Sequence, residues 1–202
     1  MILDHISGIF AHPQREWFGI RAERRSKTSE FLQHVPFLAL IPAISFYIGV
    51  TQVGWSLTRD SKVVYLTDGS ALTLCVLSYG AALVGVWCFG EFINWMHKTY
   101  SEEASNPHHG MAMAVYVTAP VFIAGLAGLW PNVWFNGAVM MLAGGYSVFL
   151  IYRGMPILMN IDRDRAFLYS TSVVTVALVM LVSLRVVTAL LWASGFGPEY
   201  RG

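Results

Sequence analysis

The hydrophobic positions of this chain gather into five long runs, and the polar positions gather into short breaks between them. A transmembrane helix needs about 20 consecutive, mostly apolar residues to cross the hydrocarbon core of a bilayer. Each run has about that length and is therefore predicted to span a membrane. The predicted spans are residues 35–55, 71–95, 111–130, 132–155 and 172–194. Pro156 is predicted to end the fourth span, because a proline disfavours helix at the residue before it.

Composition supports the same class. The chain has 202 residues, 55% of them hydrophobic and only 12% charged, whereas an ordinary soluble domain is about 25% charged. The polar segments are too short to bury a soluble core, which excludes a separate enzymatic domain. We therefore predict an all-α integral membrane bundle of five transmembrane helices. Its parts are a cytoplasmic amphipathic or interfacial segment (1–34), the five-span domain (35–194) and a short external tail (195–202).

Basic residues predict the orientation of the bundle. Nine lysines and arginines fall in the amino-terminal segment and in the connections after the second and fourth spans. The other side carries Arg59, Lys62 and Arg201. Because cytoplasmic loops are enriched in basic residues, the amino terminus is expected in the cytoplasm and the carboxyl terminus outside. The segment 1–10 lacks the basic start and long apolar core of a cleavable signal peptide.

Aromatic and basic residues cluster on the expected cytoplasmic side. They suit the headgroup layer of a membrane, with aromatic rings at the interface and cations on anionic lipid. Lipid contact is the simpler interpretation, and a docking surface for a protein partner is the more specific one. The candidate interaction surface consists of Trp17, Arg21, Arg24, Arg25, Tyr152 and Pro156.

Two ionisable residues, Glu91 and Arg185, lie well inside predicted spans, whereas Arg153 falls at the end of the fourth. Insertion of a charged residue at the bilayer centre costs about 2.5–3.5 kcal/mol, so such residues are the default functional candidates. Their predicted depths differ by about 14 Å along the membrane normal, which places them in separate layers. We expect one polar layer of Glu91, Asn94 and Arg153 and another of Arg185, Asn136 and Gln52. Either layer would fix helix register as a buried network or form part of an ion path.

The sequence contains no motif for covalent or cofactor chemistry. Nucleophile elbows, phosphate-binding loops and zinc-protease helices are absent. The pair His108 and His109 falls in a predicted loop and lacks the ligand spacing of a zinc motif. We therefore expect no catalytic residue, no metal site and no cofactor.

Several short motifs resemble a known family. They are 10–17 (FAHPQREW), 51–55 (TQVGW), 116–120 (YVTAP), 145–146 (GY) and 152–156 (YRGMP). Their order and spacing resemble the bacterial YohC-like inner-membrane branch of the Yip (Rab-GTPase-interacting) domain family. The resemblance implies five spans, a cytoplasmic amino terminus and a bacterial inner (cytoplasmic) membrane location. The Asp-Leu-Tyr-Gly-Pro signature of eukaryotic members is absent, so binding of Rab GTPases is not carried over.

These observations predict a non-enzymatic membrane adaptor or membrane-organising protein. Its expected partners are the lipid bilayer, a membrane or cytoplasmic protein, and a second copy through small-residue helix surfaces such as Ala81/Gly85; nucleic acid is not among them. The alternative is a small transporter or channel that uses Glu91 and Arg185. A third interpretation is lipid binding or bilayer shaping by the amino-terminal segment.

Overall fold

The computed structural model describes residues 2–23, 25–55, 63–101 and 106–201. Five of its helices are long and apolar enough to cross a membrane, as predicted. The helices of the described part are α1 (Ile2–Ala11), α2 (Pro13–Ala22), α3 (Lys27–Ile48), α4 (Asp68–Tyr100), α5 (Pro107–Ala124), α6 (Val133–Leu158) and α7 (Arg163–Leu191). Three short turns extend the spans: η1 (Gly49–Val53), η2 (Gly125–Leu129) and η3 (Trp192–Phe196). The all-α membrane class is therefore confirmed, whereas the orientation of the termini stays a prediction.

The spanning helices are longer than the apolar runs that predicted them. α3 begins at Lys27, inside the predicted interfacial segment, and the side chain of Ser26 caps it by accepting from the Ser29 amide at 3.1 Å. Asn106 caps α5 in the same way, with Pro107 in the first turn. Polar first turns carry no hydropathy signal, so an apolar window begins several residues too late.

The prediction that Pro156 ends the fourth span is wrong. α6 continues through Pro156 to Leu158, and the Met159 amide still bonds to the Met155 carbonyl at 3.0 Å. A proline this close to the end of a helix removes one hydrogen bond, and the helix completes only a short stretch beyond it. The chain then turns at Asn160, which has a positive φ of 52°.

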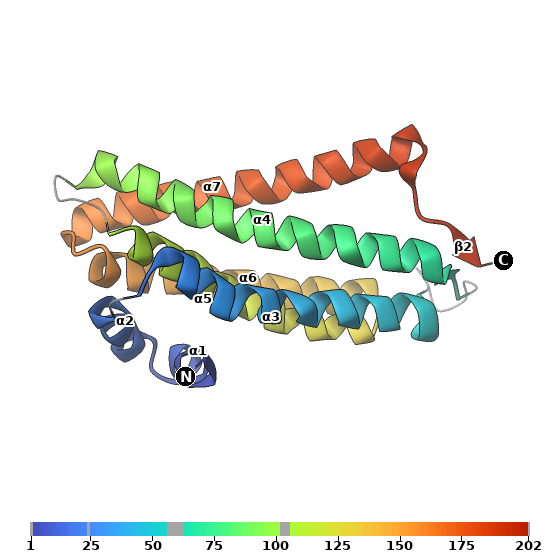
Figure 1. Ribbon diagram of the computed structural model, residues 1–202, viewed down its shortest axis with the longest axis horizontal. Coiled ribbons are helices and arrows are strands. Elements are labelled where there is room, and N and C mark those ends of the chain that lie inside the picture. Colours follow the sequence, from blue (N-terminus) through green and yellow to red (C-terminus); the bar gives the residue numbers. More distant parts are fainter. Residues whose placement is uncertain (1, 24, 56–62, 102–105, 202) are drawn as a thin grey trace.

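α5 is the central helix of the bundle, and its residues from Gly110 to Val117 are all buried inside the protein. α3, α4 and α6 pack around it, and α7 contacts α4 and α6. α1 and α2 lie outside the spans, with α2 packed against α6 (Figure 1). The backbones of η1 and η2 approach closely, because a Cβ on Gly49 would overlap the carbonyl of Gly128. Glycine is required there because no side chain fits.

The two ends of the bundle differ. We call one end the α2 end; it holds α1, α2 and the first turns of α3, α5 and α7. The opposite end, the β end, holds a two-stranded antiparallel sheet of β1 (Tyr65–Leu66) and β2 (Tyr200–Arg201). The predicted external tail therefore returns from α7 to the bundle (Figure 1).

Candidate functional sites

A buried polar cluster lies at the α2 end, between α3 and α5. The side chains of Glu30 and His34 are fully buried, and that of His108 is 1% exposed. Nε2 of His108 lies 3.3 Å from a carboxylate oxygen of Glu30, which joins the first turn of α5 to the first turn of α3. Charges buried in this way are tolerated when they are paired and hydrogen-bonded.

The hydrogen bonds of His34 indicate its tautomer. Nδ1 lies 2.8 Å from the backbone oxygen of Glu30, which only accepts, so Nδ1 carries the proton. Nε2 can then accept from the hydroxyl of Tyr116, 3.4 Å away on α5. Arg25 adds a cation at the edge of the cluster, with its guanidinium 3.6 Å from the Glu30 carboxylate. The cluster thus ties α3 to α5 through two histidines, a tyrosine and a carboxylate.

Sequence reasoning missed this cluster for identifiable reasons. Glu30 and His34 were assigned to the interfacial segment, although their spacing of four residues places them on one helix face. His108 was assigned to a loop, although Asn106-Pro107 is the cap-and-proline pattern that begins a helix. Across the described residues, no three histidine, cysteine, aspartate or glutamate side chains are arranged to hold a metal ion.

α2 is attached to the bundle by two of the residues predicted to form the interaction surface. Trp17 is fully buried and packs on Gly154 of α6, where an added Cβ would come within 2.5 Å of the indole. Its ring meets Tyr116 edge-on at 6.3 Å. Arg21 donates to the carbonyl of Ile157 at 3.1 Å. Trp17 is therefore not on an outer surface, whereas Arg21 is half-buried and its place on the interaction surface stays a prediction.

Some of the remaining predicted surface residues make contacts within the chain. The hydroxyl of Tyr152 lies 2.9 Å from that of Thr171, which links α6 to α7. Pro156 is half-buried, Arg25 pairs with Glu23 at 2.8 Å, and Arg24 lies outside the described residues. The exposed face of α2 carries Gln14, Arg15 and Phe18 instead, and the side chain of Phe18 is 56% exposed.

Glu91 has a different partner from the predicted one. Its carboxylate lies 2.6 Å from Nζ of Lys27, whose ammonium also lies 5.4 Å from the ring centroid of Trp87. Arg153 lies over Phe149 of its own helix, and Asn94 donates to the carbonyl of Pro107 at 3.0 Å. The expected pairing of Glu91 with Arg153 is therefore wrong, because the early start of α3 brings Lys27 beside α4.

The second predicted layer is not joined by hydrogen bonds either. Asn136 donates to the carbonyls of Trp130 and Asn132, at 2.7 and 2.9 Å, and so secures the turn before α6. Gln52 is exposed in η1, and Arg185 is exposed on α7. Among the described residues, no hydrogen bond or ion pair joins these three side chains, nor Arg185 to Glu91.

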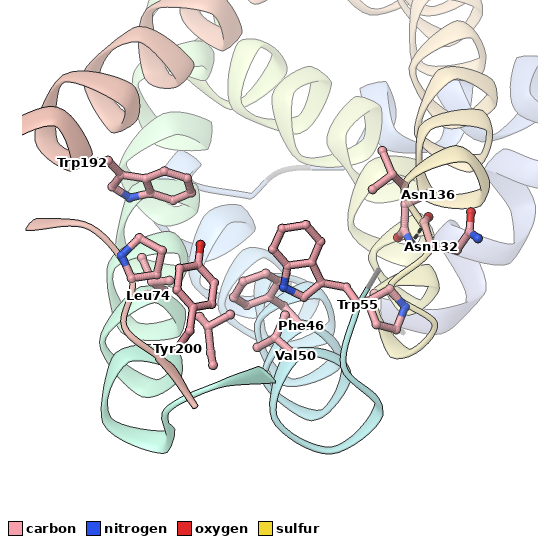
Figure 2. Close-up of a pocket in the computed structure, with 13 residues that line it drawn as sticks. Phe46, Val50, Trp55, Leu74, Asn132, Asn136, Trp192 and Tyr200 are labelled. Atoms are coloured by element: carbon pink, nitrogen blue, oxygen red, sulfur yellow. Dashed lines mark hydrogen bonds between the residues drawn. The ribbon is translucent and has the colours of Figure 1, made fainter. Parts of the chain in front are cut away.

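An apolar pocket of about 330 Å³ lies at the β end. Figure 2 shows Trp192 and Tyr200 on one side, Asn132 and Asn136 on the other, and Trp55 between them. α3, η1, α4, α6 and the carboxyl-terminal tail all contribute to its lining. The lining residues are Phe46, Val50, Trp55, Leu66, Leu74, Gly128, Pro131, Asn132, Val133, Asn136, Trp192, Pro198 and Tyr200.

Comparison with known proteins gives one consistent result. The family model of the Yip1 domain matches residues 7–184. The chain is 35% identical over 194 residues to the inner membrane protein YohC of Escherichia coli strain K12, across 96% of this chain and 98% of that protein. The YohC protein of Escherichia coli O6:H1 strain CFT073 gives the same identity and coverage. No solved structure matches the chain.

Proposed function

We propose that this chain, which belongs to the Yip1 domain family and lies as a multi-pass protein in a bacterial inner membrane, is a non-enzymatic adaptor. The proposed docking site is the exposed face of α2. The positive-inside distribution of charge favours a cytoplasmic position for this face. Its occupant would be a cytoplasmic or membrane protein.

The attachment of α2 to α6 carries this proposal. A helix that only rests on lipid would keep its tryptophan in the headgroup layer. Here Trp17 is instead buried against Gly154, and Arg21 bonds to the backbone of α6. The helix is therefore held in a fixed position, while Phe18 and Arg15 remain exposed. Aromatic and arginine side chains held rigidly in this way are typical of protein-binding hot spots.

The cluster of Glu30, His34, His108 and Tyr116 also helps to fix the position of α2. It joins α3 to α5 at the α2 end, and Tyr116 contacts both His34 and Trp17. The position of α2 is thus coupled to the bundle through buried contacts. A preorganised surface binds with a smaller loss of conformational entropy than a flexible segment.

The test is chemical cross-linking in intact membranes, followed by purification and mass spectrometry. The variant Arg15→Glu/Phe18→Ala changes the exposed face and leaves Trp17 and Arg21 in place. The matched control, Arg165→Glu/Phe167→Ala, changes an equally exposed pair at the same end of the bundle, on α7. We expect the α2 variant to lose at least tenfold of a stoichiometric protein partner that the control retains. Equal recovery by both variants would contradict the adaptor function.

A second candidate, a small transporter or channel, is favoured by one observation. Arg185 lies within a spanning helix and is exposed, with no ion-pair partner among the described residues. Flux through reconstituted vesicles should then fall with Arg185→Gln and with Glu91→Gln. Unchanged flux in both variants would exclude a pathway through these two residues.

A further inference from the structure

An ion pair between Lys27 and Glu91 lies on the outer surface of the bundle, between α3 and α4. Nζ of Lys27 is 2.6 Å from a carboxylate oxygen of Glu91, and the two side chains are 35% and 41% exposed. α3 and α4 pack side by side (Figure 1), so the pair faces the bilayer rather than the interior of the bundle. Charges on a membrane-spanning surface are costly unless polar groups meet them. The pair is therefore a candidate for contact with a lipid headgroup.

The position of the pair along the bundle matches the headgroup layer. Lys27 is the first residue of α3, where Ser26 caps the helix, so the pair lies where this span enters the membrane. Trp95, one turn beyond Glu91 on α4, is 66% exposed, and tryptophan favours the headgroup layer. These two observations place the ion pair at the level of the lipid headgroups on the α2 side of the membrane.

An exposed apolar face runs from the pair toward the bilayer centre. Leu77, Val84 and Glu91 follow one another on α4 at intervals of seven residues, which is about two helical turns, so the three side chains share one face. Leu77 is 61% exposed and Val84 is 64% exposed. Lipid chains that extend from a headgroup on the pair would lie along this face. The surface thus has the orientation of a phospholipid in that leaflet, with the charges outermost and the apolar side chains deeper.

Aromatic contacts hold the pair in place. The Lys27 ammonium lies 5.4 Å from the ring centroid of Trp87, which is one turn before Glu91. The Trp87 ring in turn meets Phe31 of α3 edge-on at 5.2 Å. An ammonium has three donors and a carboxylate has about four acceptor sites, so their mutual bond leaves capacity on both groups. The surface therefore presents one cation and one anion side by side in fixed positions.

We propose that this pair binds the headgroup of one phosphatidylethanolamine of the surrounding leaflet. The lipid phosphate accepts from Lys27 and the lipid ammonium donates to Glu91, so that each charge of the zwitterion meets its opposite. Phosphatidylglycerol offers a phosphate but no cation for Glu91, and phosphatidylcholine offers a cation without an N–H donor, so both should bind less well. The inference goes beyond the proposed adaptor function, because it concerns the lipid-facing side of α3 and α4 and not the exposed face of α2.

Native mass spectrometry of the full chain, released from nanodiscs that contain equal amounts of phosphatidylethanolamine and phosphatidylglycerol, tests the proposal. The wild-type chain should retain one phosphatidylethanolamine in preference to phosphatidylglycerol. Glu91→Gln and Lys27→Gln should each reduce that retention about tenfold, because each variant loses a charge-assisted hydrogen bond to the headgroup. The matched control Lys98→Gln removes an exposed lysine from the same end of α4 and should retain the lipid.

A series of lipids tests the ammonium contact without any change to the protein. Successive N-methylation of phosphatidylethanolamine keeps the charge of the headgroup and removes one N–H donor at each step. Retention by the wild-type chain should therefore fall along the series that ends at phosphatidylcholine. Glu91→Gln should lose this dependence on methylation, because the anion that accepts from the ammonium is gone.

Three results would overturn the proposal. Equal retention of phosphatidylethanolamine and phosphatidylglycerol by the wild-type chain would show that the pair does not recognise the zwitterion. Equal losses in Lys27→Gln and Lys98→Gln would indicate general attraction of lipid phosphate to basic residues. Retention that does not change with N-methylation would exclude the hydrogen bond from the ammonium to Glu91. None of these results depends on the partner proposed for α2, so the two proposals fail separately.

Discussion

The α2 end and the β end of this bundle are closed by different interactions. At the α2 end, Glu30, His34 and His108 are buried together. Trp17 packs into the notch that Gly154, which has no side chain, leaves in the surface of α6. At the β end, the half of α7 from Leu181 onward is exposed, and the tail that follows it pairs with β1 of the bundle. In a bilayer, apolar helix surfaces gain little from meeting each other, whereas buried polar groups need partners within the protein. Buried polar residues therefore determine which end of this bundle is tightly packed.

The largest expected effect follows from removing the Glu30 carboxylate from the buried cluster at the α2 end. Glu30→Ala leaves His108 and Arg25 without their shared carboxylate and should destabilise the bundle by about 3–5 kcal/mol, as for other broken buried pairs. The matched control Glu91→Ala removes a carboxylate that is 41% exposed in its pair with Lys27 and should cost below about 1 kcal/mol. Unfolding in mixed micelles, followed by tryptophan fluorescence, measures both. Equal losses would contradict the importance assigned to the cluster.

A smaller effect is expected where α2 meets α6. Gly154→Val would force a side chain into the indole of Trp17, with an overpacking penalty of about 1–3 kcal/mol. α2 should then detach and become cleavable by added protease. Gly144→Val is the matched control on the same helix, because a Cβ there meets nothing within 4 Å. If α2 stays resistant to protease in Gly154→Val, the notch does not hold it.

The smallest effect on stability is expected at the β end. Arg201→Ala removes the exposed ion pair with Asp68 beside the β1–β2 ladder and should change stability by about 0–1 kcal/mol. The tail should nevertheless leave the bundle more often, since the two-residue ladder and the hydrogen bonds of Glu199 are then left to hold it. Amide hydrogen exchange at Leu66 and Tyr200 would measure the release. Faster exchange at the α2 end as well would show that the two ends are coupled.

The sequence was sufficient to predict the fold class, because five apolar runs leave few alternatives in 202 residues. It was insufficient for the partners of charged residues. Hydropathy placed Lys27 and Glu30 in a surface segment, whereas the structure places them in the first turns of a spanning helix. Predicted depth then matches Glu91 with Arg153, whereas the structure pairs Glu91 with Lys27.

Other features of the sites are set by contacts between distant segments. Trp17 was predicted to be interfacial because tryptophan favours that layer, but Gly154 provides a notch for its ring. Nothing in the local pattern of either segment indicates this contact. The same holds for the tail, where β2 pairs with β1 although each strand has only two residues. Strands this short give no periodic signal in the sequence.

The most direct test of the account is photo-cross-linking from both ends in native membranes. A benzophenone amino acid is placed at position 18 in one variant, in place of Phe18, and at position 181 in another, in place of Leu181. Both side chains are exposed, and Leu181 begins the exposed half of α7. The account predicts a discrete protein adduct from position 18 and phospholipid adducts from position 181. Lipid adducts alone from position 18, or a protein adduct from position 181, would contradict it.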